Sequence, residues 1–445
     1  MSADDGPGGT RRLVLLLNNP FVADSRSWKI ARSMGAAGWS VTVVARTADG
    51  LPDREERDGF VLVRVAQPRP LPWLPSPRLP EADQGSASLA ATPAAATSGR
   101  PWRSRLAATV TAVIGRPVQA VRYLLLARQW AARIADVVPA ADIWQAEGLI
   151  TLPVALALRK RTGGRVVYDV RDLQVESSRF ARLPGPWRRL LARRERRWAR
   201  SADAVLTANQ VYADVIVRTL GVRPAVVFNG PVSVGAEARD PSASPPVPVR
   251  ERLALAPSTR IVLCLGNVAP GRGVEQLCRA IADVPDAALL IVGPGGAFRD
   301  RLVAEATTLP ATDRIHFLPG VPPGDIPAWT AAADVAAIAI QPTTLNHRLT
   351  TPTRLFDALG AGLPVVASDL PGIASIVRPA GCGVLCDPTD PTAIAAALRE
   401  VLDGPPERRL ALREAALAAG DRYAWERQVE ALVEVYERIG GVARA

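Results

Sequence analysis

Two series of short apolar runs, in which each run is separated from the next by a helical pattern, most constrain the fold of this 445-residue chain. The first series lies within residues 11–230 and the second within residues 258–420. Apolar strands that alternate with helices form a parallel sheet that helices cover on both faces. Residues 231–257, between the two series, are rich in Pro, Ser and Ala, as is typical of linkers. The sequence therefore predicts an α/β fold of two doubly wound domains, whose ligands bind at the carboxyl ends of the strands.

Two segments depart from this alternation. Residues 68–104 interrupt the first series with eight prolines and an Ala/Ser-rich tract. Such a composition cannot bury enough apolar surface to fold, so we expect a flexible surface insertion. Residues 421–445 carry an amphipathic pattern that is long enough for a helix to cross back towards the first domain.

The net charge of +11 and a pI near 10.4 imply an anionic partner, such as nucleic acid, an acidic membrane surface or a phosphorylated ligand. No aromatic-basic nucleic-acid module is present, so nucleic acid is not an expected partner. Residues 181–200 contain eight arginines and one acid, Glu195, together with the apolar residues Trp187, Leu190, Leu191 and Trp198. A solvated helix packed through this apolar stripe and a helix that binds an anionic lipid or acceptor both fit the pattern.

Side chains that bind metal ions are few and scattered. They are Cys264, Cys278, Cys382, Cys386, His316 and His347. The Cys382–Cys386 pair lacks a second ligand pair, so we expect no metal site and free thiols in a reducing cytoplasm. The apolar run at 13–17 is too short for a signal sequence, and arginines and a proline interrupt the run at 106–126. We therefore expect a cytoplasmic protein, with the inner face of the membrane as an open alternative.

Residues 346–372, NHRLTTPTRLFDALGAGLPVVASDLPG, place one acid, Asp357, near the start of an apolar helix. Thr351 is the predicted N-cap of this helix and Pro352 its first residue. The free N–H groups at this helix end suit a phosphate, and Asp357 lies one turn further, within reach of a sugar hydroxyl attached to that phosphate. A surface ion pair between Arg354 and Asp357 is the alternative, and the motif alone leaves both open.

Residues 263–281, LCLGNVAPGRGVEQLCRAI, indicate a strand that ends at Gly266, a glycine-bearing loop and a helix that begins near Val274. Arg272 lies between two glycines, where the backbone can approach an anion while the guanidinium binds it. An ordinary strand-to-helix loop is the alternative. A second glycine-rich strand end lies at 289–296, but neither has the spacing of a dinucleotide fingerprint. Nicotinamide and flavin cofactors are therefore not expected.

With these segments in this order, the chain resembles the GT-B-fold retaining glycosyltransferases of family 4. The resemblance runs from NNPFVADSRSWKIARSMGAAGWSVTVVA through VVYDVRDL and VVFNGP to the closing helix, and it is strongest over residues 263–278 and 346–372. It implies two Rossmann-like domains that face a cleft, with the acceptor in the first domain and the nucleotide sugar in the second. It also implies transfer of a sugar from a nucleoside diphosphate to an acceptor hydroxyl, without a metal ion or other cofactor.

The resemblance also assigns roles to individual residues. Arg272 matches the residue that contacts the donor diphosphate, Asp357 matches the acid that binds the nucleotide ribose, and Arg171 takes the place of an acceptor-side histidine. These three are the predicted catalytic residues. The predicted donor-binding residues are Gly266, Asn267, Gly271, Arg272, Gly293, Asn346, His347, Thr351, Thr353, Arg354 and Asp357. The predicted acceptor-side residues are Asp24, Arg26, Asp169, Arg171 and Asp172.

Three positions depart from the family pattern. Asn267 stands where many members have a second arginine, so diphosphate binding is expected to depend more on Arg272. Leu349 stands where the first glutamate of the family falls, and the sugar contact is then expected from residues 346–347. Arg171 replaces a common histidine. Because the leaving phosphate is often proposed to deprotonate the acceptor in these enzymes, activity is compatible with this replacement.

The predicted function is therefore a metal-independent, retaining glycosyltransferase. A catalytically silent GT-B partner or nucleotide-binding subunit is the alternative, and the missing glutamate and histidine favour it. A nucleotide-sugar epimerase on the same fold would need its own acid/base pair, which the sequence does not reveal.

Overall fold

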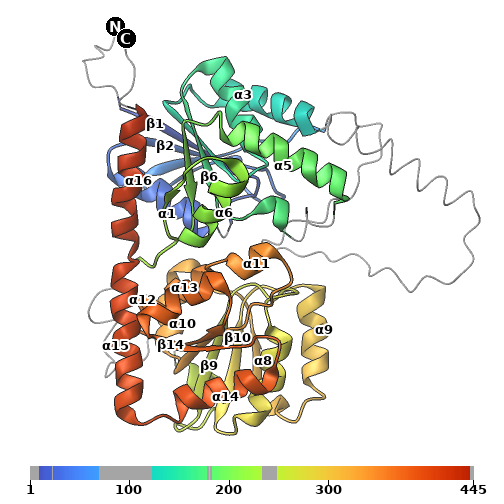
Figure 1. The fold of residues 1–445 in the computed structure, drawn as a ribbon, viewed down its shortest axis with the longest axis vertical. Helices are drawn as coiled ribbons and strands as arrows, with labels where there is room; N and C mark the ends of the chain where they lie inside the picture. The colour runs from blue at the N-terminus through green and yellow to red at the C-terminus, as the bar shows by residue number, and fades with distance from the viewer. Residues whose placement is uncertain are drawn as a thin grey trace, which may run out of the picture.

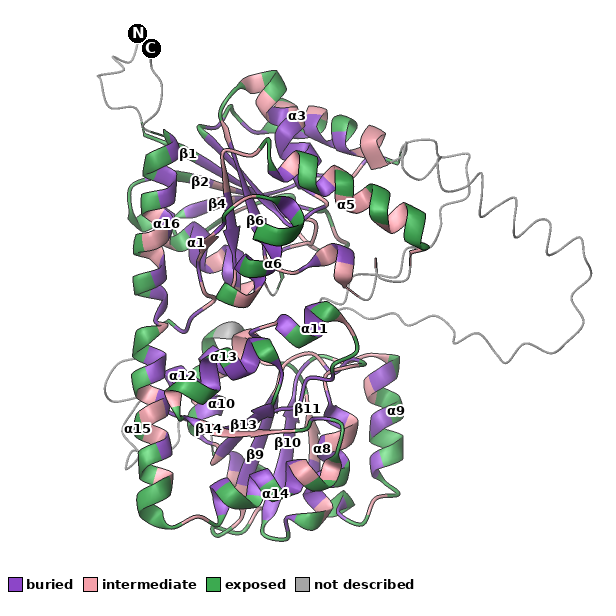
Figure 2. Cartoon of the chain, viewed as in Figure 1, coloured by how far each residue is buried: buried purple, intermediate pink, exposed green. Residues whose placement is uncertain are grey.

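The computed structural model describes residues 10–22, 24–69, 123–177, 180, 183–232 and 248–440. Two α/β domains lie one above the other in Figure 1, and a pair of long helices at the end of the chain runs along both. The central strands of each sheet are buried and the helices expose their outer faces, as the purple and green of Figure 2 show. The predicted fold of two doubly wound α/β domains is confirmed.

An eight-stranded sheet of order β3-β4-β2-β1-β5-β6-β7-β8 forms the first domain. Its strands are β1 (Arg12–Leu16), β2 (Ser40–Ala45), β3 (Arg54–Arg57), β4 (Phe60–Arg64), β5 (Ile143–Glu147), β6 (Arg165–Val170), β7 (Ala204–Thr207) and β8 (Ala225–Val226). Neighbouring strands pair in parallel except for β3 and β4, which form an antiparallel edge. Strand β3 was not predicted, because its residues, REER, are all charged and carry no apolar pattern.

The helices of the first domain follow its strands. They are α1 (Ser25–Ala36), a helix over 123–137, α3 (Leu152–Thr162), the short η1 (Gln174–Glu176), α5 (Gly185–Ala199) and α6 (Gln210–Leu220). Asp24 is the N-cap of α1, and its carboxylate accepts a hydrogen bond from the Ser27 N–H. Asn209 caps α6 in the same way through the Tyr212 N–H. Side chains of this kind satisfy N–H groups that a helix leaves free in its first turn.

The second domain contains a six-stranded parallel sheet of order β11-β10-β9-β12-β13-β14. Its strands are β9 (Arg260–Leu265), β10 (Ala287–Val292), β11 (Ile315–Leu318), β12 (Val335–Ile338), β13 (Val365–Ser368) and β14 (Gly383–Cys386). Its helices are α7 (Val249–Arg252), α8 (Val274–Ala280), η3 (Ile281–Asp283), α9 (Ala297–Ala306), η4 (Thr312–Arg314), η5 (Pro323–Asp325), α10 (Ile326–Ala331), α11 (Leu345–Leu349), α12 (Thr353–Gly360), α13 (Pro371–Ala380), α14 (Pro391–Leu402) and α15 (Pro406–Arg422).

The strand orders locate the functional edge of each sheet. In the first sheet the chain moves outward from β1 to β2 and later returns to place β5 on the other side of β1. In the second sheet β10 and β12 flank β9 in the same way. Ligands of open α/β sheets bind at the carboxyl ends of the strands where the order reverses. The loops after β1, β5, β9 and β12 are therefore the places to search for a site.

The last helix returns to the first domain. Helix α16 (Trp425–Gly440) buries Trp425, Leu432 and Tyr436 against the core on the α1 side of the first sheet. Helix α15, which precedes it, packs Ala416 and Ala419 on the second domain instead. The predicted crossing of a C-terminal helix is thus confirmed, and the two helices stand end to end along the molecule in Figure 1.

Parts of several predicted segments lie outside the described residues, among them residues 181–182 of the arginine-rich segment and residues 441–445 of the closing segment. Residues 70–104 of the insertion, residues 106–122 of the apolar run and residues 233–247 of the linker also lie outside them. Among the residues that the structure does describe, no helix is both long and apolar enough to span a membrane.

Candidate active site

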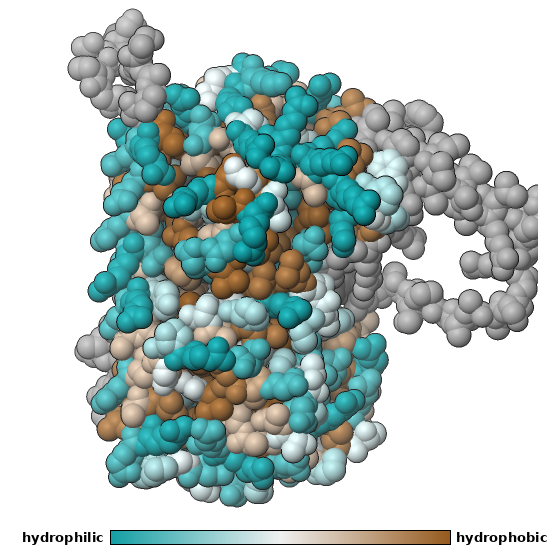
Figure 3. All heavy atoms as spheres, in the orientation of Figure 1, coloured by the Kyte–Doolittle hydropathy of each residue, from teal (hydrophilic) through white to brown (hydrophobic). Residues whose placement is uncertain are grey.

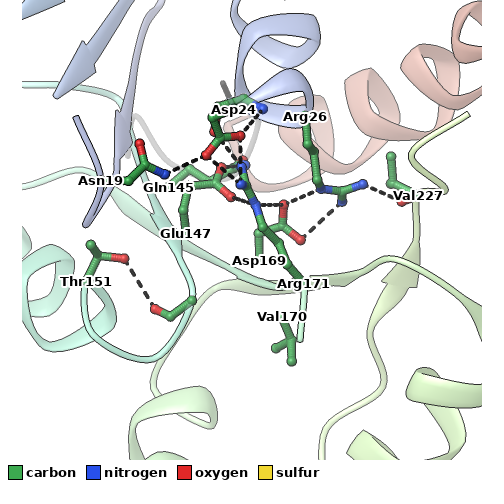
Figure 4. Close-up of polar contacts among 12 residues, drawn as sticks. Asn19, Asp24, Arg26, Gln145, Glu147, Thr151, Asp169, Val170, Arg171 and Val227 are labelled. Carbon is green, nitrogen blue, oxygen red and sulfur yellow. Dashed lines mark hydrogen bonds and ion pairs between the residues drawn. The ribbon is translucent and has the colours of Figure 1, made fainter. Parts of the chain in front are cut away.

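A cluster of charged side chains lies at the carboxyl ends of β1, β5 and β6. Asp24 and Arg26 come from the start of α1, Glu147 from the last residue of β5, Asp169 from β6 and Arg171 from the residue after that strand (Figure 4). Four of these five were predicted as acceptor-side residues, and the structure brings those four together.

Each guanidinium of the cluster binds carboxylates. Arg26 donates through Nε and Nη2 to the two oxygens of Asp169, at 2.8 and 3.1 Å, and through Nη1 to the Val227 carbonyl at 2.7 Å. Arg171 donates through Nη1 to Asp24 at 2.8 Å, and its Nε lies 2.5 Å from Oε2 of Glu147. Asn19 fixes the other side of Asp24 with a hydrogen bond of 2.8 Å.

The balance of charge in this cluster favours a proton on Glu147. Glu147 and Asp169 are direct neighbours in the pairing of β5 with β6, so two like charges meet there. Burial, together with Asp169 and Asp24, raises the pKa of Glu147 to about 8 against the opposing charge of Arg171. Burial also disfavours the ionised form of Asp169, but Arg26 and Arg171 outweigh it and hold the pKa of Asp169 below its ordinary value. The cluster contains three acids and two guanidiniums, so that a proton on one acid makes its net charge zero.

Glu147 was not predicted as a site residue. The predicted strand ended one residue earlier, and only its position at a strand end could have pointed to it. Gln145, two residues before it on the same face of β5, is the other polar residue of that strand, and both are buried.

The second domain contributes the loop between β9 and α8. Gly273 caps α8 with a φ of 76°, and a Cβ there would lie 1.8 Å from the Ala339 carbonyl oxygen. A Cβ on Gly293 would likewise lie 1.8 Å from the Gly266 carbonyl oxygen. Gly271 adjoins the ring of His347, whose Nδ1 is 2.8 Å from Thr343 Oγ1. The predicted glycines therefore pack the loops after β9, β10 and β12 closely together.

Two guanidiniums in this region have no carboxylate partner among the described residues. Neither Arg272 nor Arg354 forms an ion pair with any residue in the described ranges. Arg354 donates through Nη1 to the Leu265 carbonyl at 2.9 Å, whereas its buried Nη2 makes no hydrogen bond with any described residue. Burial lowers the pKa of Arg354, and the nearby charge of Arg272 acts in the same direction. An anion placed between them would relieve both effects.

The Arg354–Asp357 surface ion pair, which the motif left open, is wrong. Burial raises the pKa of Asp357 to about 6, and the charge that opposes this rise is Lys29 of α1, in the first domain. Asp357 and Arg354 line a cavity of about 10 Å³ beside Leu265. This is the space of roughly one water, so a nucleotide does not fit inside it.

The start of α12 also differs from the prediction. The helix begins at Thr353 with Pro352 as N-cap, because the Thr351 hydroxyl turns to the first domain and accepts from Asn209 Nδ2 at 3.2 Å. Thr353 Oγ1 accepts from Asn229 Nδ2 at 2.7 Å. Both hydroxyls therefore contact the first domain in this structure.

Asn346 contacts the first domain as well. Its Oδ1 accepts from the Leu173 N–H and the Tyr212 hydroxyl, each at 2.8 Å, and its Nδ2 donates to Asp172 at 3.1 Å. Its polar atoms are thus engaged between the domains, and Asp172, predicted on the acceptor side, lies with Asn346 rather than in the charged cluster. Asn267 is half-buried in the loop after β9.

The cysteines and the possible metal ligands lie as follows in the described residues. Cys264, Cys278 and Cys382 are buried free thiols, and Cys386 is half-buried and free. Burial raises the pKa of Cys382 to about 11. Within the described ranges, no three His, Cys, Asp or Glu side chains are grouped so as to hold a metal ion.

Comparison with known proteins extends these observations. Residues 24–230 match the glycosyl transferase 4-like domain, and residues 249–418 match the glycosyl transferases group 1. The D-inositol 3-phosphate glycosyltransferase of Xylanimonas cellulosilytica is 29% identical over 268 residues, which are 57% of this chain and 61% of that protein. The match thus spans less than two thirds of this relative.

Solved structures resemble the whole chain. Sucrose-phosphate synthase from Thermosynechococcus elongatus aligns with a TM-score of 0.68 and 19% identity over 97% of this chain and 100% of the other. A structure from E. coli described as trehalose-6-phosphate bound with UDP-2-fluoro glucose aligns with a TM-score of 0.66 and 13% identity, over 97% and 99%. The fold and the two domain matches together place this chain among the GT-B glycosyltransferases of the family-4-like kind.

Proposed function

We propose that the chain moves a sugar from a nucleoside-diphosphate sugar to an acceptor hydroxyl, with retention of configuration and without a metal ion. The observation that carries this proposal is the unpaired state of Arg272 and Arg354 among the described residues. Arg354 lies in the first turn of α12, where free N–H groups add to the positive potential. A diphosphate supplies the negative charge that this region lacks.

The leaving diphosphate accounts for the residue types on the donor side. Negative charge develops on its oxygens as the bond to the sugar breaks, and the two guanidiniums stabilise that charge. A phosphate oxygen then takes the proton of the acceptor hydroxyl on the face that the diphosphate leaves. The product keeps the configuration of the donor, and no protein base is required. Asp357 accepts hydrogen bonds from the ribose, once the side chains around its small cavity move apart.

The charged cluster of the first domain is the proposed acceptor side. Asp24 and Arg171 lie at the carboxyl end of the first sheet, where a doubly wound domain binds its ligand. The mutual ion pairs hold these side chains in fixed positions, so that they can orient an acceptor hydroxyl. The relative named above is a D-inositol 3-phosphate glycosyltransferase, which makes phosphorylated cyclitols the first acceptors to test.

The deciding experiment incubates the protein with UDP- and GDP-sugars, each with and without candidate acceptors, and measures the release of nucleoside diphosphate. Release from one donor that depends on one acceptor supports the proposal, and the anomeric configuration of the product tests retention. A protein that binds the nucleotides but releases no diphosphate from any donor would be the silent partner instead. Activity that persists at full level in a chelator supports independence from metal ions.

We also propose that α5 places the protein at an anionic membrane on the cytoplasmic side. Its outer face exposes Arg189, Arg193, Arg196, Arg197 and Arg200, and none of these forms an ion pair with a residue in the described part of the chain. Hydrophilic side chains gather over this helix in Figure 3. The single acid of the helix, Glu195, is buried on the opposite face, where it accepts from the Tyr168 hydroxyl at 2.8 Å.

The predicted apolar stripe of α5 is only partly buried. Trp198 packs on the core, with its ring 6.2 Å from that of Tyr123, but Leu190 is 37% exposed beside the arginines. Co-sedimentation with phosphatidylcholine vesicles, with and without phosphatidylglycerol, tests the membrane proposal. Binding should require the anionic lipid and should fall when Arg189, Arg193 and Arg197 are replaced by glutamine. Equal binding to neutral vesicles would contradict it.

A further inference from the structure

A line of buried polar side chains joins the crossover helix α16 to the charged cluster. The Tyr436 hydroxyl donates to Gln145 Oε1, and Gln145 Nε2 donates to Glu147 Oε1 at 2.7 Å. The other oxygen of Glu147 is the one that lies 2.5 Å from Nε of Arg171. Tyr436 and Gln145 are fully buried, and Glu147 is 8% exposed. The line therefore runs from helix to guanidinium through the protein interior.

The position of Gln145 makes this line informative. The Gln145 side chain lies on the face of the sheet that packs against α1 and α16. Its pairing neighbours on the adjacent strands, Leu15 and Val167, belong to the apolar core on that face. A buried amide without partners would cost about 1–3 kcal/mol at such a place, whereas an apolar residue would cost nothing of the kind. The presence of a glutamine is therefore best explained by the groups that its two ends hold.

The directions of the hydrogen bonds are also determined. Burial, with the negative charges of Glu147 and Asp169, raises the pKa of Tyr436 far above its ordinary value, so its hydroxyl keeps its hydrogen. The Gln145 oxygen accepts that hydrogen, which turns the Gln145 N–H group towards Glu147. Without the hydroxyl, nothing would prevent the amide from rotating by half a turn and presenting its oxygen to the carboxyl group.

We propose that Tyr436 is a positioning residue for the acceptor site: through Gln145 it holds the Glu147 carboxyl group against Arg171, so that the docked crossover helix sets the orientation of that guanidinium. The assignment of Arg171 to the acceptor site rests on the proposed function. Arg171 also contacts Asp24 and the Ser27 hydroxyl at the start of α1, and its Nε lies 3.8 Å from Oδ2 of Asp169 in β6. Glu147 is thus the link between the guanidinium and the end of the chain.

The line has a consequence for the titration of Glu147. This carboxyl group faces Arg171, Asp169, Asp24 and Arg26, and the Gln145 N–H favours its ionised form. Loss of that donor should raise the pKa of Glu147 above its value of about 8. Because this pKa already lies above the ordinary 4.5, the stability that Glu147 contributes is present at low pH and is lost as the pH rises through about 8. A higher pKa of Glu147 therefore extends the pH range over which this stability is lost to higher pH.

The test compares Tyr436→Phe, which keeps the ring, with Ser33→Ala. The control removes the 2.9 Å hydrogen bond between Trp425 Nε1 and Ser33 Oγ, which also joins α16 to α1 but does not touch the line. Thermal unfolding of the full chain is measured from about pH 5 to pH 10. UDP affinity is measured by calorimetry, and acceptor kcat and KM are measured with whichever donor and acceptor react.

In Tyr436→Phe, the pH at which stability stops falling should rise by about 0.5–1 unit relative to the wild type, and Ser33→Ala should leave it unchanged. UDP affinity should be the same in both variants, while kcat/KM for the acceptor should fall about threefold to tenfold in Tyr436→Phe alone. Gln145→Leu should reproduce the pH shift, and combining it with Tyr436→Phe should add nothing further.

Identical pH profiles in Tyr436→Phe and Ser33→Ala would overturn the inference, as would effects of Tyr436→Phe and Gln145→Leu that simply add. If the wild type transfers no sugar to any acceptor, the proposed function fails, while the pH profiles and the additivity test still decide whether the line exists. A fall in UDP affinity in Tyr436→Phe would instead place the influence of α16 on the donor side and contradict the proposal.

Discussion

Replacing Asp357 by asparagine separates a ribose contact from a structural role. Asparagine keeps the shape of the side chain and removes its charge. If the carboxylate accepts hydrogen bonds from ribose hydroxyls, nucleotide binding should weaken by about 1.5–3 kcal/mol, which is roughly tenfold to hundredfold in affinity. Because the pKa of Asp357 is about 6, wild-type affinity should rise as the pH increases through 6, and the variant should lose this dependence.

The same pKa predicts an opposite effect on stability. A carboxyl group whose pKa rises from 3.8 to about 6 on folding contributes stability at low pH, and this contribution is lost as the pH rises through 6. The shift corresponds to a loss of up to about 3 kcal/mol, which asparagine does not suffer. The stability of Asp357→Asn relative to the wild type should therefore increase between about pH 4 and pH 6.

The assay is calorimetric titration of both proteins with the ribonucleotide and its 2′,3′-dideoxy analogue. A ribose contact predicts that the wild type prefers the ribonucleotide and that Asp357→Asn loses much of this preference. Asp369→Asn is the matched control, since Asp369 forms an exposed ion pair of 2.8 Å with Arg378 in the same domain. Asp369→Asn should change neither the affinity for the ribonucleotide nor that for its dideoxy analogue. Additive effects of the mutation and the missing hydroxyls would refute the assignment.

Two further substitutions test the packing and the charge of the site. Glu147→Gln should leave the rate of sugar transfer nearly unchanged at pH 6.5, because Glu147 with a pKa of about 8 is already mostly protonated at that pH. The same variant should remove the pH dependence of the rate around pH 8. A pH–rate profile that keeps the same midpoint in the variant would contradict the assignment. Gly273→Ala should destabilise the second domain by at least about 2 kcal/mol in chemical denaturation, since its Cβ would meet the Ala339 carbonyl at 1.8 Å with a φ of 76°. An unchanged midpoint of unfolding would show that the loop can move aside.

Most of the fold was predictable because it is encoded locally. The apolar runs at β1, β2, β9 and β10 fill the sheet cores, and each is flanked by helical patterns that cover them. Strand β3 escaped prediction because an exposed edge strand needs no apolar residues. The start of α12 was misplaced by one residue, because the Thr351 hydroxyl contacts Asn209 of the other domain, and no local pattern reports such a contact.

The residues of the proposed donor side are easier to find from the sequence than those of the proposed acceptor side. Arg272, Arg354 and Asp357 lie in two contiguous motifs whose glycines and helix end indicate an anion site. The acceptor-side cluster instead joins residues that are more than a hundred positions apart, such as Arg26 and Asp169. Glu147 and its link to Tyr436, in the last helix, could be found only once the strands were paired and α16 was in place.

The most direct test of the central claim, that the unpaired guanidiniums hold a nucleoside diphosphate, is calorimetric titration of Arg272→Ala with UDP and GDP. Arg279→Ala, which removes an exposed arginine of the adjoining helix α8, is the control. The account predicts that whichever nucleotide the wild type binds loses about tenfold or more in affinity to Arg272→Ala, with an unchanged circular dichroism spectrum, and that the control binds as the wild type does. Equal affinity in the wild type and in a folded Arg272→Ala variant would contradict it and place the diphosphate elsewhere.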